Sequence, residues 1–471
     1  MALVLTSKSK PHCMLNIWAG YVYISSLKFY KYFILNTKGN VAAIFALTIV
    51  PMLLSISLAI DFSRSSSKKV RLDAALDSAV LYVASKASKS GTISNISELT
   101  KEAELYFQNQ IKSISEISVE PVALKITQSS SGTRAVKAEA HYKASLASWI
   151  KNPVSGQDVR INLSGYSASE IALPSYIDFY LLLDNSPSMG LAASPEDIDK
   201  LRTLTPESCE FACHTVYSDG SFDPNDNLAI ARRNNVTLRI DLLAQATSAL
   251  VSNAKSTQSK SGLENQFKVG IYGFNQDVSV LSGSDHKLYI FDNGLLSDLV
   301  MAGTKAASLT LTPYSADGNF HLTDFTSAFS AMNSIVSSPG DGSKAETPQK
   351  YLFFVTDGVQ DMRQGSSSLT DPKYTQYDFW GHTLAPIDPQ MCFSLKSRGI
   401  KVAVLYTTYY ATAPGDSPLY DQNIAYWADD ISAKLQDCAS PGLFYTASST
   451  GIKDAMLKMF QDAVKNARLT D

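Results

Sequence analysis

The chain has 471 residues, which is long enough for two or three domains and a large hydrophobic core. Its formal net charge of -3 and its pI of about 6.1 argue against bulk binding to nucleic acid. Hydrophobic residues make up 45% of the chain and charged residues 18%, so the sequence predicts a folded protein with some membrane content and excludes a disordered one.

The first segment, residues 1–38, is rich in aromatic side chains, which recur from Trp18 to Phe33. Two interpretations stay open for it: an interfacial helix, or upstream sequence that reflects a misplaced start codon. In the first case the segment would lie against the membrane surface. We expect the segment to be cytoplasmic.

The next segment predicts a transmembrane anchor over residues 39–62. Val41–Ile60 contains no charged residue and has the length of about 20 residues that crosses the hydrocarbon core of a bilayer. Pro51 in its middle is tolerated in such helices. A buried helix of a soluble domain would not be apolar on all sides over this length. A cleaved signal peptide has a shorter apolar region and a small-residue cleavage pattern, so we expect a single retained anchor.

Charge alone does not orient this anchor, because basic residues occur on both sides of it. The cysteines are more informative. One lies before the anchor and four lie after it, at Cys13, Cys209, Cys213, Cys392 and Cys438. A lone thiol inside and two pairs outside suit a cytoplasmic N-terminus and about 410 residues in an oxidising exterior. We therefore expect one disulfide between Cys392 and Cys438.

The other pair lies in the sequence Cys-Glu-Phe-Ala-Cys-His, from Cys209 to His214. A c-type haem site has two residues between its cysteines, whereas three stand here, and a zinc site needs a further ligand that the sequence does not show. We expect a local disulfide that closes this loop, with a metal site as the alternative.

Residues 63–172 predict a helical stalk and a small α+β module. From Ser65 to about Ser115 apolar residues recur at three- and four-residue spacing, so we expect the anchor helix to continue out of the membrane. Small residues dominate one face of that helix, which permits close packing against another element. From Glu116 to Tyr166 polar and apolar residues alternate, which is typical of strands.

Residues 173–471 alternate between apolar strand patterns and amphipathic helix patterns, which predicts an α/β fold with a doubly wound, mostly parallel sheet. The expected strands are 176–183, 267–274, 350–356, 400–407 and 443–446. The expected helices are 232–254, 324–337, 387–398 and 451–467. The stretch 191–230, rich in Ser, Pro and Asp, is expected to be an insertion that covers or rims a site at the sheet edge.

The motif most indicative of a binding site is Asp-Asn-Ser-Pro-Ser, which directly follows the apolar run Tyr176–Leu183. Its Asp184, Ser186 and Ser188 place a carboxylate and two hydroxyls at the end of a strand. Pro187 holds the preceding residue extended, so that both hydroxyls face one way. Oxygen ligands of this kind suit Mg²⁺, Mn²⁺ or Ca²⁺ rather than zinc or copper.

Two further loops supply oxygen atoms. Asp357 ends an apolar strand at a turn where Gly358 gives backbone freedom. Thr323 stands at the start of the helical pattern Asp324–Val336, where it could instead cap the helix, and Thr326 is a rival for the ligand role. Ligands of doubly wound sheets bind at the carboxyl ends of strands. We therefore expect one shared site for a divalent ion, Mg²⁺ or otherwise Mn²⁺ or Ca²⁺, around Asp184, Ser186, Ser188 and Asp357, with Thr323 or Thr326 supplying the hydroxyl of the remaining loop.

These residues resemble the metal site of the von Willebrand factor type A domain, which has Asp-x-Ser-x-Ser, a Thr from a second loop and an Asp from a third. The resemblance covers about Ser175–Leu469. It implies a metal-ion-dependent adhesion site in which one coordination position stays open for an acidic side chain of a protein partner. The residues that the resemblance implies as ligands of the ion are Asp184, Ser186, Ser188, Thr323 and Asp357.

The N-terminal part supports a second resemblance. Lys38-Gly39-Asn40 before the apolar run, and the helical Leu72-Asp73-Ala74-Ala75-Leu76-Asp77 after it, are similar to TadG-type proteins of the tight-adherence (Flp) pilus system. Those proteins pair such an anchor with an exterior von Willebrand A domain, and Cys-Glu-Phe-Ala-Cys-His resembles their insertion. The resemblance implies an inner-membrane protein whose C-terminal domain is periplasmic or outside and whose partners are pilus or Tad secretion components. Type IV prepilins carry a glutamate where Ile44 stands, so we expect no cleavage after Gly39.

Three functions are compatible with these features. The leading hypothesis is a membrane-anchored, outward-facing pilus assembly or adhesion protein that binds its partner through the metal ion. A structural scaffold with an unused metal site is the second. A metal-dependent hydrolase is the third, but an aspartyl phosphatase needs a carboxylate where Ser186 stands, and no Gly-x-Ser-x-Gly motif occurs. Because the histidines are scattered, we expect no enzyme activity; those considered are His214, His286, His321 and His382.

Overall fold

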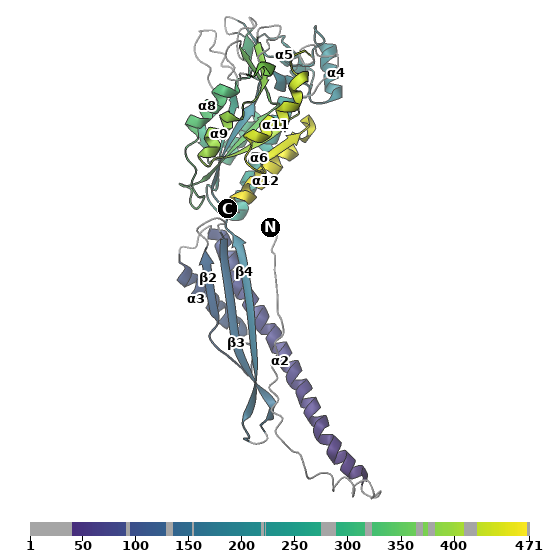
Figure 1. Ribbon diagram of the computed structural model, residues 1–471, viewed down its shortest axis with the longest axis vertical. Helices are drawn as coiled ribbons and strands as arrows, with labels where there is room; N and C mark the ends of the chain where they lie inside the picture. Colours follow the sequence, from purple (N-terminus) through teal and green to yellow (C-terminus); the bar gives the residue numbers. More distant parts are fainter. Residues whose placement is uncertain are drawn as a thin grey trace. The chain divides into compact units, whose positions relative to one another are not determined.

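The computed structural model describes residues 40–90, 95–128, 135–152, 155–217, 221, 223–274, 289–315, 323–363, 371–374, 382–408 and 422–468. The chain divides into two compact units, Met1–Leu173 and Pro174–Asp471 (Figure 1). The predicted cytoplasmic segment 1–38, with Cys13, lies outside the described residues, as do His286 and His321.

One unbroken helix, α2 (Asn40–Ser90), carries both the apolar segment and the stalk of the first unit. Within the described residues, this is the one helix long and apolar enough to cross a membrane. Its apolar segment Val41–Ile60 is largely exposed, whereas the later turns bury Leu72, Leu76 and Val83. The predicted continuation of the anchor helix is therefore confirmed. The helical region is not continuous to Ser115, however, because a second helix, α3 (Ile96–Ile111), begins at the capping residue Asn95.

The sheet of the first unit is antiparallel. The long strands β3 (Ala135–Lys151) and β4 (Asp158–Ala172) form a hairpin, and the other edge of β3 pairs with β1 (Ile117–Val119) and β2 (Ala123–Gln128). Alternate side chains of β3 are buried against α2 and α3, as the sequence alternation predicted. Many of these side chains are alanines, so the helix can lie close to the sheet. The buried residues of β3 that share this core are Val136, Ala138, Ala140, Tyr142 and Ala144.

The second unit is built on a six-stranded sheet in the order β14-β13-β10-β5-β7-β8. Neighbouring strands are parallel except for β8, which runs antiparallel to β7. The central strands are buried along their whole length, because helices cover both faces. The bounds are β5 (Ile177–Asp184), β7 (Phe267–Phe274), β8 (Tyr289–Leu296), β10 (Gln349–Thr356), β13 (Lys401–Thr407) and β14 (Phe444–Ala447).

Two hydrophobic cores lie on the two faces of this sheet. Phe179, Leu181 and Leu183 of β5 pack with helices α6 (Arg239–Ser261), α7 (Leu299–Ala307) and α12 (Ile452–Arg468). The alternate residues Tyr180 and Leu182 pack with α8 (Phe325–Ile335), α9 (Gln390–Ser397) and α11 (Ala428–Cys438). This three-layer arrangement confirms the predicted α/β class.

The connections of the sheet create a switch point between β5 and β10. From β5 the chain moves outward through β7 to β8, then returns to the other side of β5 for β10, β13 and β14. In doubly wound sheets the crevice outside the carboxyl ends of the strands at such a reversal is where ligands bind. The residues that end these two strands carry the candidate site.

The insertion 191–230 folds against the loop that follows β5. It contains α4 (Pro195–Leu204) and the short strand β6 (Thr215–Val216), and α5 (Asn227–Arg233) begins within it. Strand β6 pairs in parallel with β9 (Tyr314–Ser315), and β11 (Val359–Arg363) pairs antiparallel with β12 (His382–Pro386). Four single 3-10 turns complete the described elements: η1 (Pro187–Gly190), η3 (Pro372–Tyr374), η4 (Ala425–Trp427) and η5 (Ser449–Gly451).

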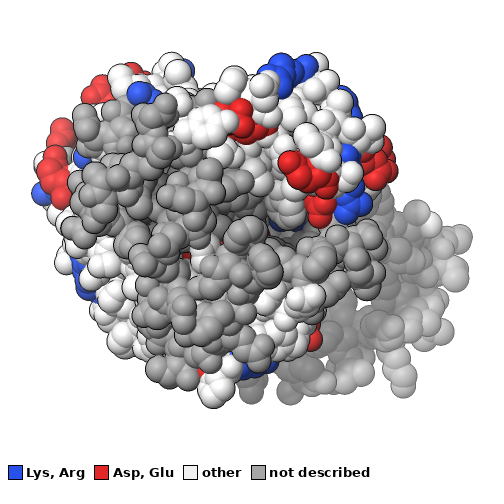
Figure 2. Space-filling model, turned by 90° about the horizontal axis from the view of Figure 1, so that it is seen from above, with Lys and Arg blue, Asp and Glu red and all other residues white. Residues whose placement is uncertain are grey.

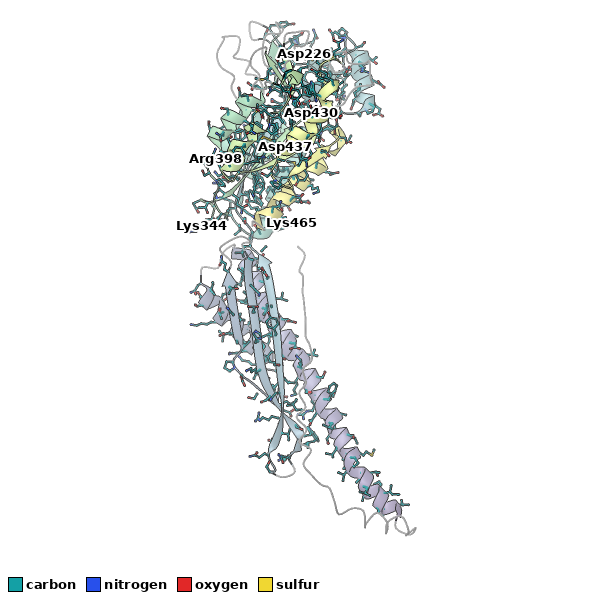
Figure 3. The ribbon with its side chains drawn as sticks, in the orientation of Figure 1. Asp226, Lys344, Arg398, Asp430, Asp437 and Lys465 are labelled. Atoms are coloured by element: carbon teal, nitrogen blue, oxygen red, sulfur yellow. A yellow bond between two sulfur atoms is a disulfide. The ribbon has the colours of Figure 1, made fainter. Side chains whose placement is uncertain are left out.

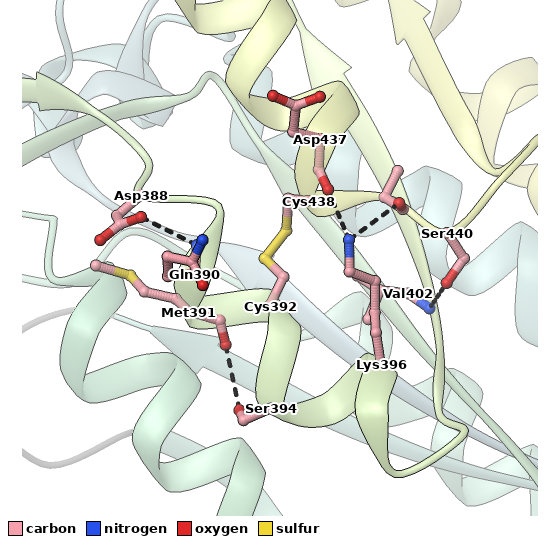
Figure 4. Close-up of a disulfide and its surroundings, with 11 residues drawn as sticks. Asp388, Gln390, Met391, Cys392, Ser394, Lys396, Val402, Asp437, Cys438 and Ser440 are labelled. Carbon is pink, nitrogen blue, oxygen red and sulfur yellow. Dashed lines mark hydrogen bonds between the residues drawn. A yellow bond between two sulfur atoms is a disulfide. The ribbon is translucent and has the colours of Figure 1, made fainter.

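A disulfide joins Cys392 of α9 to Cys438 of α11, as the sequence predicted (Figure 4). The bond is buried, and Lys396 reinforces the contact of the two helices by donating hydrogen bonds to the carbonyl oxygens of Asp437 and Ala439, at 2.6 and 3.4 Å. The predicted disulfide between Cys209 and Cys213 is wrong, because both cysteines are thiols in the structure. The side chains instead share a hydrogen bond.

Candidate metal site

Asp184, the last residue of β5, is completely buried at the carboxyl edge of the sheet. One carboxylate oxygen, Oδ1, accepts a hydrogen bond from the backbone N–H of Ser186 at 3.0 Å. The other, Oδ2, accepts one from the hydroxyl of Thr356 at 2.6 Å. These bonds fix the carboxylate at the point where β5 meets β10.

The hydroxyls of Ser186 and Ser188 lie 2.9 Å apart, directly after Asp184. Ser186 has the extended backbone that Pro187 imposes on a preceding residue, with φ -64° and ψ 165°. The turn η1 then brings Ser188 back beside it. The structure therefore places one carboxylate and both predicted hydroxyls together.

Asp357 follows β10 and is likewise completely buried. The chain turns sharply at Gly358, whose φ of 85° lies in the left-handed region that favours glycine. Asp357 Oδ1 accepts a hydrogen bond from the N–H of Val359 at 3.4 Å, and the Ser188 hydroxyl contacts the carboxylate. Its Oδ2 is buried without a hydrogen-bond partner among the described residues. A buried carboxylate oxygen in this state is costly unless a cation or donor meets it.

The two buried carboxylates repel each other. Burial raises the pKa of Asp184, and the nearby charge of Asp357 raises it further. Burial also raises the pKa of Asp357, against the opposing effects of the Ser188 hydroxyl and the Arg239 charge. Two carboxylates buried side by side favour binding of a proton or a metal cation, because either relieves the repulsion.

Two residues of this site were not predicted from the sequence. Thr356 donates to Asp184 and accepts the N–H of Gly358 at 2.9 Å, so its hydroxyl joins the two aspartate loops. Arg239, the first residue of α6, is buried and hydrogen-bonds to Ser449 and to the carbonyl oxygen of Thr408, both at 3.2 Å. It supplies a fixed positive charge near Asp357.

The loop of Thr323 is positioned by backbone pairing. Thr323 exchanges two backbone hydrogen bonds of 3.1 Å with Asp361, four residues after Asp357. The helix cap is the next residue, Asp324, which accepts from the N–H and hydroxyl of Ser327 at 2.9 and 2.6 Å. Thr323 is therefore not the cap. The rival Thr326 has a buried hydroxyl without a hydrogen-bond partner among the described residues.

The donor set fits a hard divalent cation. Asp184, Ser186, Ser188 and Asp357 bring two carboxylates and two hydroxyls to one buried spot, and a buried oxygen of Asp357 is unsatisfied. Oxygen donors of this kind are the ligands of Mg²⁺, Mn²⁺ and Ca²⁺. Within the described chain, no three His, Cys, Asp or Glu side chains are grouped so as to hold a metal ion. A cation here would depend on the hydroxyl groups as well as on the two carboxylates.

The cysteine segment of the insertion pairs with the loop that carries Ser188. Gly190 accepts a hydrogen bond from the N–H of Ala212 at 2.9 Å, and an isolated bridge links Leu191 to Phe211. The Cys213 thiol lowers the pKa of Cys209 to about 7. The insertion therefore packs against the loop that carries Ser188.

His214 belongs to the same insertion and is held by Asp226. Its Nδ1 lies 2.8 Å from Asp226 Oδ2, which also accepts the N–H of Thr215 at 3.0 Å. Asp226 lies toward the end of the second unit that is opposite Lys344 and Lys465 (Figure 3). Within the described residues, the contact of His214 with Asp226 therefore joins two parts of the insertion. His382 is paired in a similar way with Asp361, at 2.8 Å.

The fold and the site define a protein with a long apolar helix, a small antiparallel module and a mostly parallel α/β unit that buries two aspartates at the ends of neighbouring strands. Residues 39–86 match the family described as "Putative Flp pilus-assembly TadE/G-like". The N-terminal region of the chain is therefore TadE/G-like. No curated protein sequence matches the chain.

Solved structures of pilus proteins are similar to the chain at low sequence identity. The pilus adhesin SpaC from Lactobacillus rhamnosus GG is 13% identical with a TM-score of 0.33, over 74% of this chain and 34% of SpaC. The chain thus spans about a third of the length of SpaC. The PilB minor pilin from Streptococcus sanguinis is 12% identical with a TM-score of 0.31, over 75% of this chain and 79% of PilB. An adhesive tip pilin from Group B Streptococcus agalactiae is 10% identical with a TM-score of 0.29, over 74% of this chain and 69% of that one.

Proposed function

We propose that the chain is a membrane-anchored, outward-facing protein of Flp pilus assembly or adhesion, and that it binds a protein partner through a divalent metal ion. The observation that carries this proposal is the pair of buried carboxylates, Asp184 and Asp357, with two hydroxyls at the switch point of the sheet. The TadE/G-like region at residues 39–86 supports the connection to a pilus.

The ion would be held by Asp184, Ser186, Ser188, Thr323 and Asp357, and it would be Mg²⁺ or otherwise Mn²⁺ or Ca²⁺. When bound, it supplies a positive charge that an acidic side chain of the partner can ligate. The protein's own residues prepare the site: the Thr356 hydroxyl fixes Asp184, and the chain turns at Gly358 directly after Asp357. The buried charge of Arg239 offsets part of the carboxylate repulsion.

Helix α2 would cross the inner membrane through Val41–Ile60, with the N-terminus in the cytoplasm and both units in the periplasm or outside. The exposed apolar side chains of this segment support its contact with lipid. The disulfide Cys392–Cys438 supports an oxidising location for the second unit.

The partner would be a pilus or Tad secretion component that presents an acidic residue. On the face seen in Figure 2, acidic and basic side chains of the described residues are intermixed around the visible rim. A mixed surface of this kind suits a protein partner better than a polyanion such as nucleic acid. Metal-bridged contact would then supply specificity that surface charge alone does not.

The proposal is tested by affinity capture from membranes of the native cell, with the full-length protein in detergent as bait. We expect a pilus or Tad component to be retained in Mg²⁺ and released by EDTA, and to be absent with Asp184→Asn. Equal capture under all these conditions would point to a scaffold whose metal site is unused. Metal-dependent turnover of an ester or phosphoester that is lost in Asp184→Asn would instead support a hydrolase.

A further inference from the structure

The end of the apolar segment of α2 is marked by a buried carboxylate. Asp61 is the first charged residue after Gly39, and its exposed fraction is only 4%. The residues before it, Val41–Ile60, would span about 30 Å as a helix, which matches the hydrocarbon thickness of a bilayer. Asp61 therefore stands at the level where α2 would leave the hydrocarbon.

The partners of Asp61 come from the hairpin of β3 and β4. The backbone N–H of Trp149 donates to both oxygens of Asp61, at 3.1 and 3.2 Å, and the hydroxyl of Ser148 donates to Oδ2. Arg64 adds an ion pair at 3.7 Å. Figure 1 shows the hairpin running alongside α2, with its turn toward the end of the unit that carries the apolar segment. These bonds place Trp149 at the same depth as Asp61.

The side chains at this junction are those that favour a membrane surface. Trp149 and Phe62 are 67% and 75% exposed. The Arg64 guanidinium lies 6.0 Å from the centre of the Trp149 ring and also pairs with Glu116 at 2.8 Å. Lys151, two residues after Trp149, is exposed and lies 4.0 Å from Asp158. Trp is enriched at the membrane–water boundary, where its ring meets the headgroups, and basic side chains attract anionic lipids.

We propose that the β3–β4 hairpin is a second membrane contact, in which Trp149 and Phe62 lie in the headgroup region of a phospholipid bilayer. The inference rests on the proposed function, since it needs α2 to cross the membrane. A single helix can tilt and rotate in a bilayer, and interfacial anchors restrict both motions. The hairpin, tied to α2 through Asp61, fixes the first unit on the membrane surface.

The test is quenching of Trp fluorescence by brominated phospholipids in vesicles that contain the full-length protein. The contribution of Trp149 is the difference between the native protein and Trp149→Phe, a change that keeps the backbone N–H bonded to Asp61. We expect strong quenching of this contribution by lipids brominated at carbons 6 and 7, and weaker quenching by lipids brominated near the chain ends.

A matched control moves the indole along the same hairpin. Tyr166 of β4 is exposed and pairs with His141, eight residues from Trp149 along β3. This distance corresponds to about 26 Å of strand. In Trp149→Phe/Tyr166→Trp the relocated indole should escape quenching.

The hairpin contact and the α2 anchor can fail independently in this experiment. If the protein floats with the vesicles but bromolipids quench the native protein and Trp149→Phe equally, the hairpin contact is wrong and the anchor stands. Equal quenching of the indoles at positions 149 and 166 also overturns the contact. If the protein does not float with the vesicles, the anchor itself is contradicted, and this inference falls with it.

Discussion

The Thr356 hydroxyl of β10 donates a hydrogen bond of 2.6 Å to Asp184 Oδ2 at the end of β5, while it accepts the N–H of Gly358. It links the two loops that carry the buried carboxylates, as the contact of Ser188 with Asp357 also does. Thr356→Val keeps the shape of the side chain but leaves a buried carboxylate oxygen and a backbone N–H without this partner. An unsatisfied buried group costs about 1–3 kcal/mol, so we expect a loss of this size in the free energy of unfolding, measured by denaturant titration in EDTA.

Thr407 provides the matched control for Thr356. It ends the neighbouring strand β13, is also buried, and its hydroxyl has no hydrogen-bond partner among the described residues. Thr407→Val should therefore leave stability unchanged or raise it. Equal losses for the two variants would show that the Thr356 hydroxyl does not hold the site together.

Asp184→Asn should remove the response of the protein to Mg²⁺. A ligand that binds only the folded state stabilises it by about 2.7 kcal/mol at a hundredfold excess over Kd, and this gain should disappear in the variant. In EDTA the same variant should be more stable than the native protein, because burial and Asp357 both disfavour the charge on Asp184. Thermal unfolding with and without Mg²⁺ measures both effects.

Asp178 is the matched control for this experiment. It lies near the opposite end of β5, is buried, and pairs with Lys350 at 3.8 Å. Asp178→Asn should keep the full Mg²⁺ response. A Mg²⁺ response that survives in Asp184→Asn, or that is lost equally in Asp178→Asn, would place the ion elsewhere.

Much of the second unit was predicted because buried parallel strands are continuous apolar runs. The predicted strands match β5, β7, β10, β13 and β14 within one residue at each end. Strand β8 was missed. It lies at the sheet edge and contains Asp292, Asn293 and Gly294, which are poor strand formers.

The helices were predicted less well where polar residues or a break hide the pattern. The predicted helix 232–254 is in fact the end of α5 followed by α6, and Asn235 between them has a positive φ of 52°. Helix α11 was missed because its buried face is narrow, although its acidic first turn is typical of a helix start. The disulfide of its last residue, Cys438, was nevertheless predicted.

Of the candidate site, the sequence predicted the residues that directly follow the apolar strands. Asp184 and Asp357 follow apolar runs, and the topology then requires their proximity. Thr356 and Arg239 could not be recognised, because the first reads as an ordinary strand residue and the second as a residue inside the predicted helix 232–254. Their roles depend on which strands and helices become neighbours, and that information is not local in the sequence.

The thiol of Cys209 should react at neutral pH. Its pKa is lowered to about 7, chiefly by the hydrogen bond from Cys213, so the reactive thiolate is half formed near pH 7. We expect the rate of alkylation by iodoacetamide to rise with pH to a plateau with a midpoint near this value. Peptide mass spectrometry after timed quenching gives the rate for this residue.

Cys213→Ser and Cys213→Ala separate the causes of that shift. The serine can still hydrogen-bond to the thiolate, whereas the alanine cannot and should move the midpoint toward the ordinary cysteine value. A midpoint that stays near neutral pH in Cys213→Ala would assign the shift to another group. Rapid oxidation of the native pair to a disulfide during the assay would show that the two sulfurs bond readily.

The disulfide between Cys392 and Cys438 should contribute strongly to stability, because it closes a loop of 46 residues. The loss of loop entropy in the unfolded chain corresponds to about 4 kcal/mol at this length. Replacing both cysteines by alanine should lower the free energy of unfolding by about that amount. The matched double variant Cys209→Ala/Cys213→Ala removes no bond and should change stability far less; equal losses would contradict the assignment.

Direct binding of Mn²⁺ to the full-length protein, followed by electron paramagnetic resonance, tests the central claim most directly. The signal of free Mn²⁺ should fall until one ion is bound per chain, and Mg²⁺ should compete for the site. Asp184→Asn should abolish this binding, while Asp178→Asn should retain it. A free Mn²⁺ signal that is the same with and without the native protein would contradict a metal site at the meeting of β5 and β10.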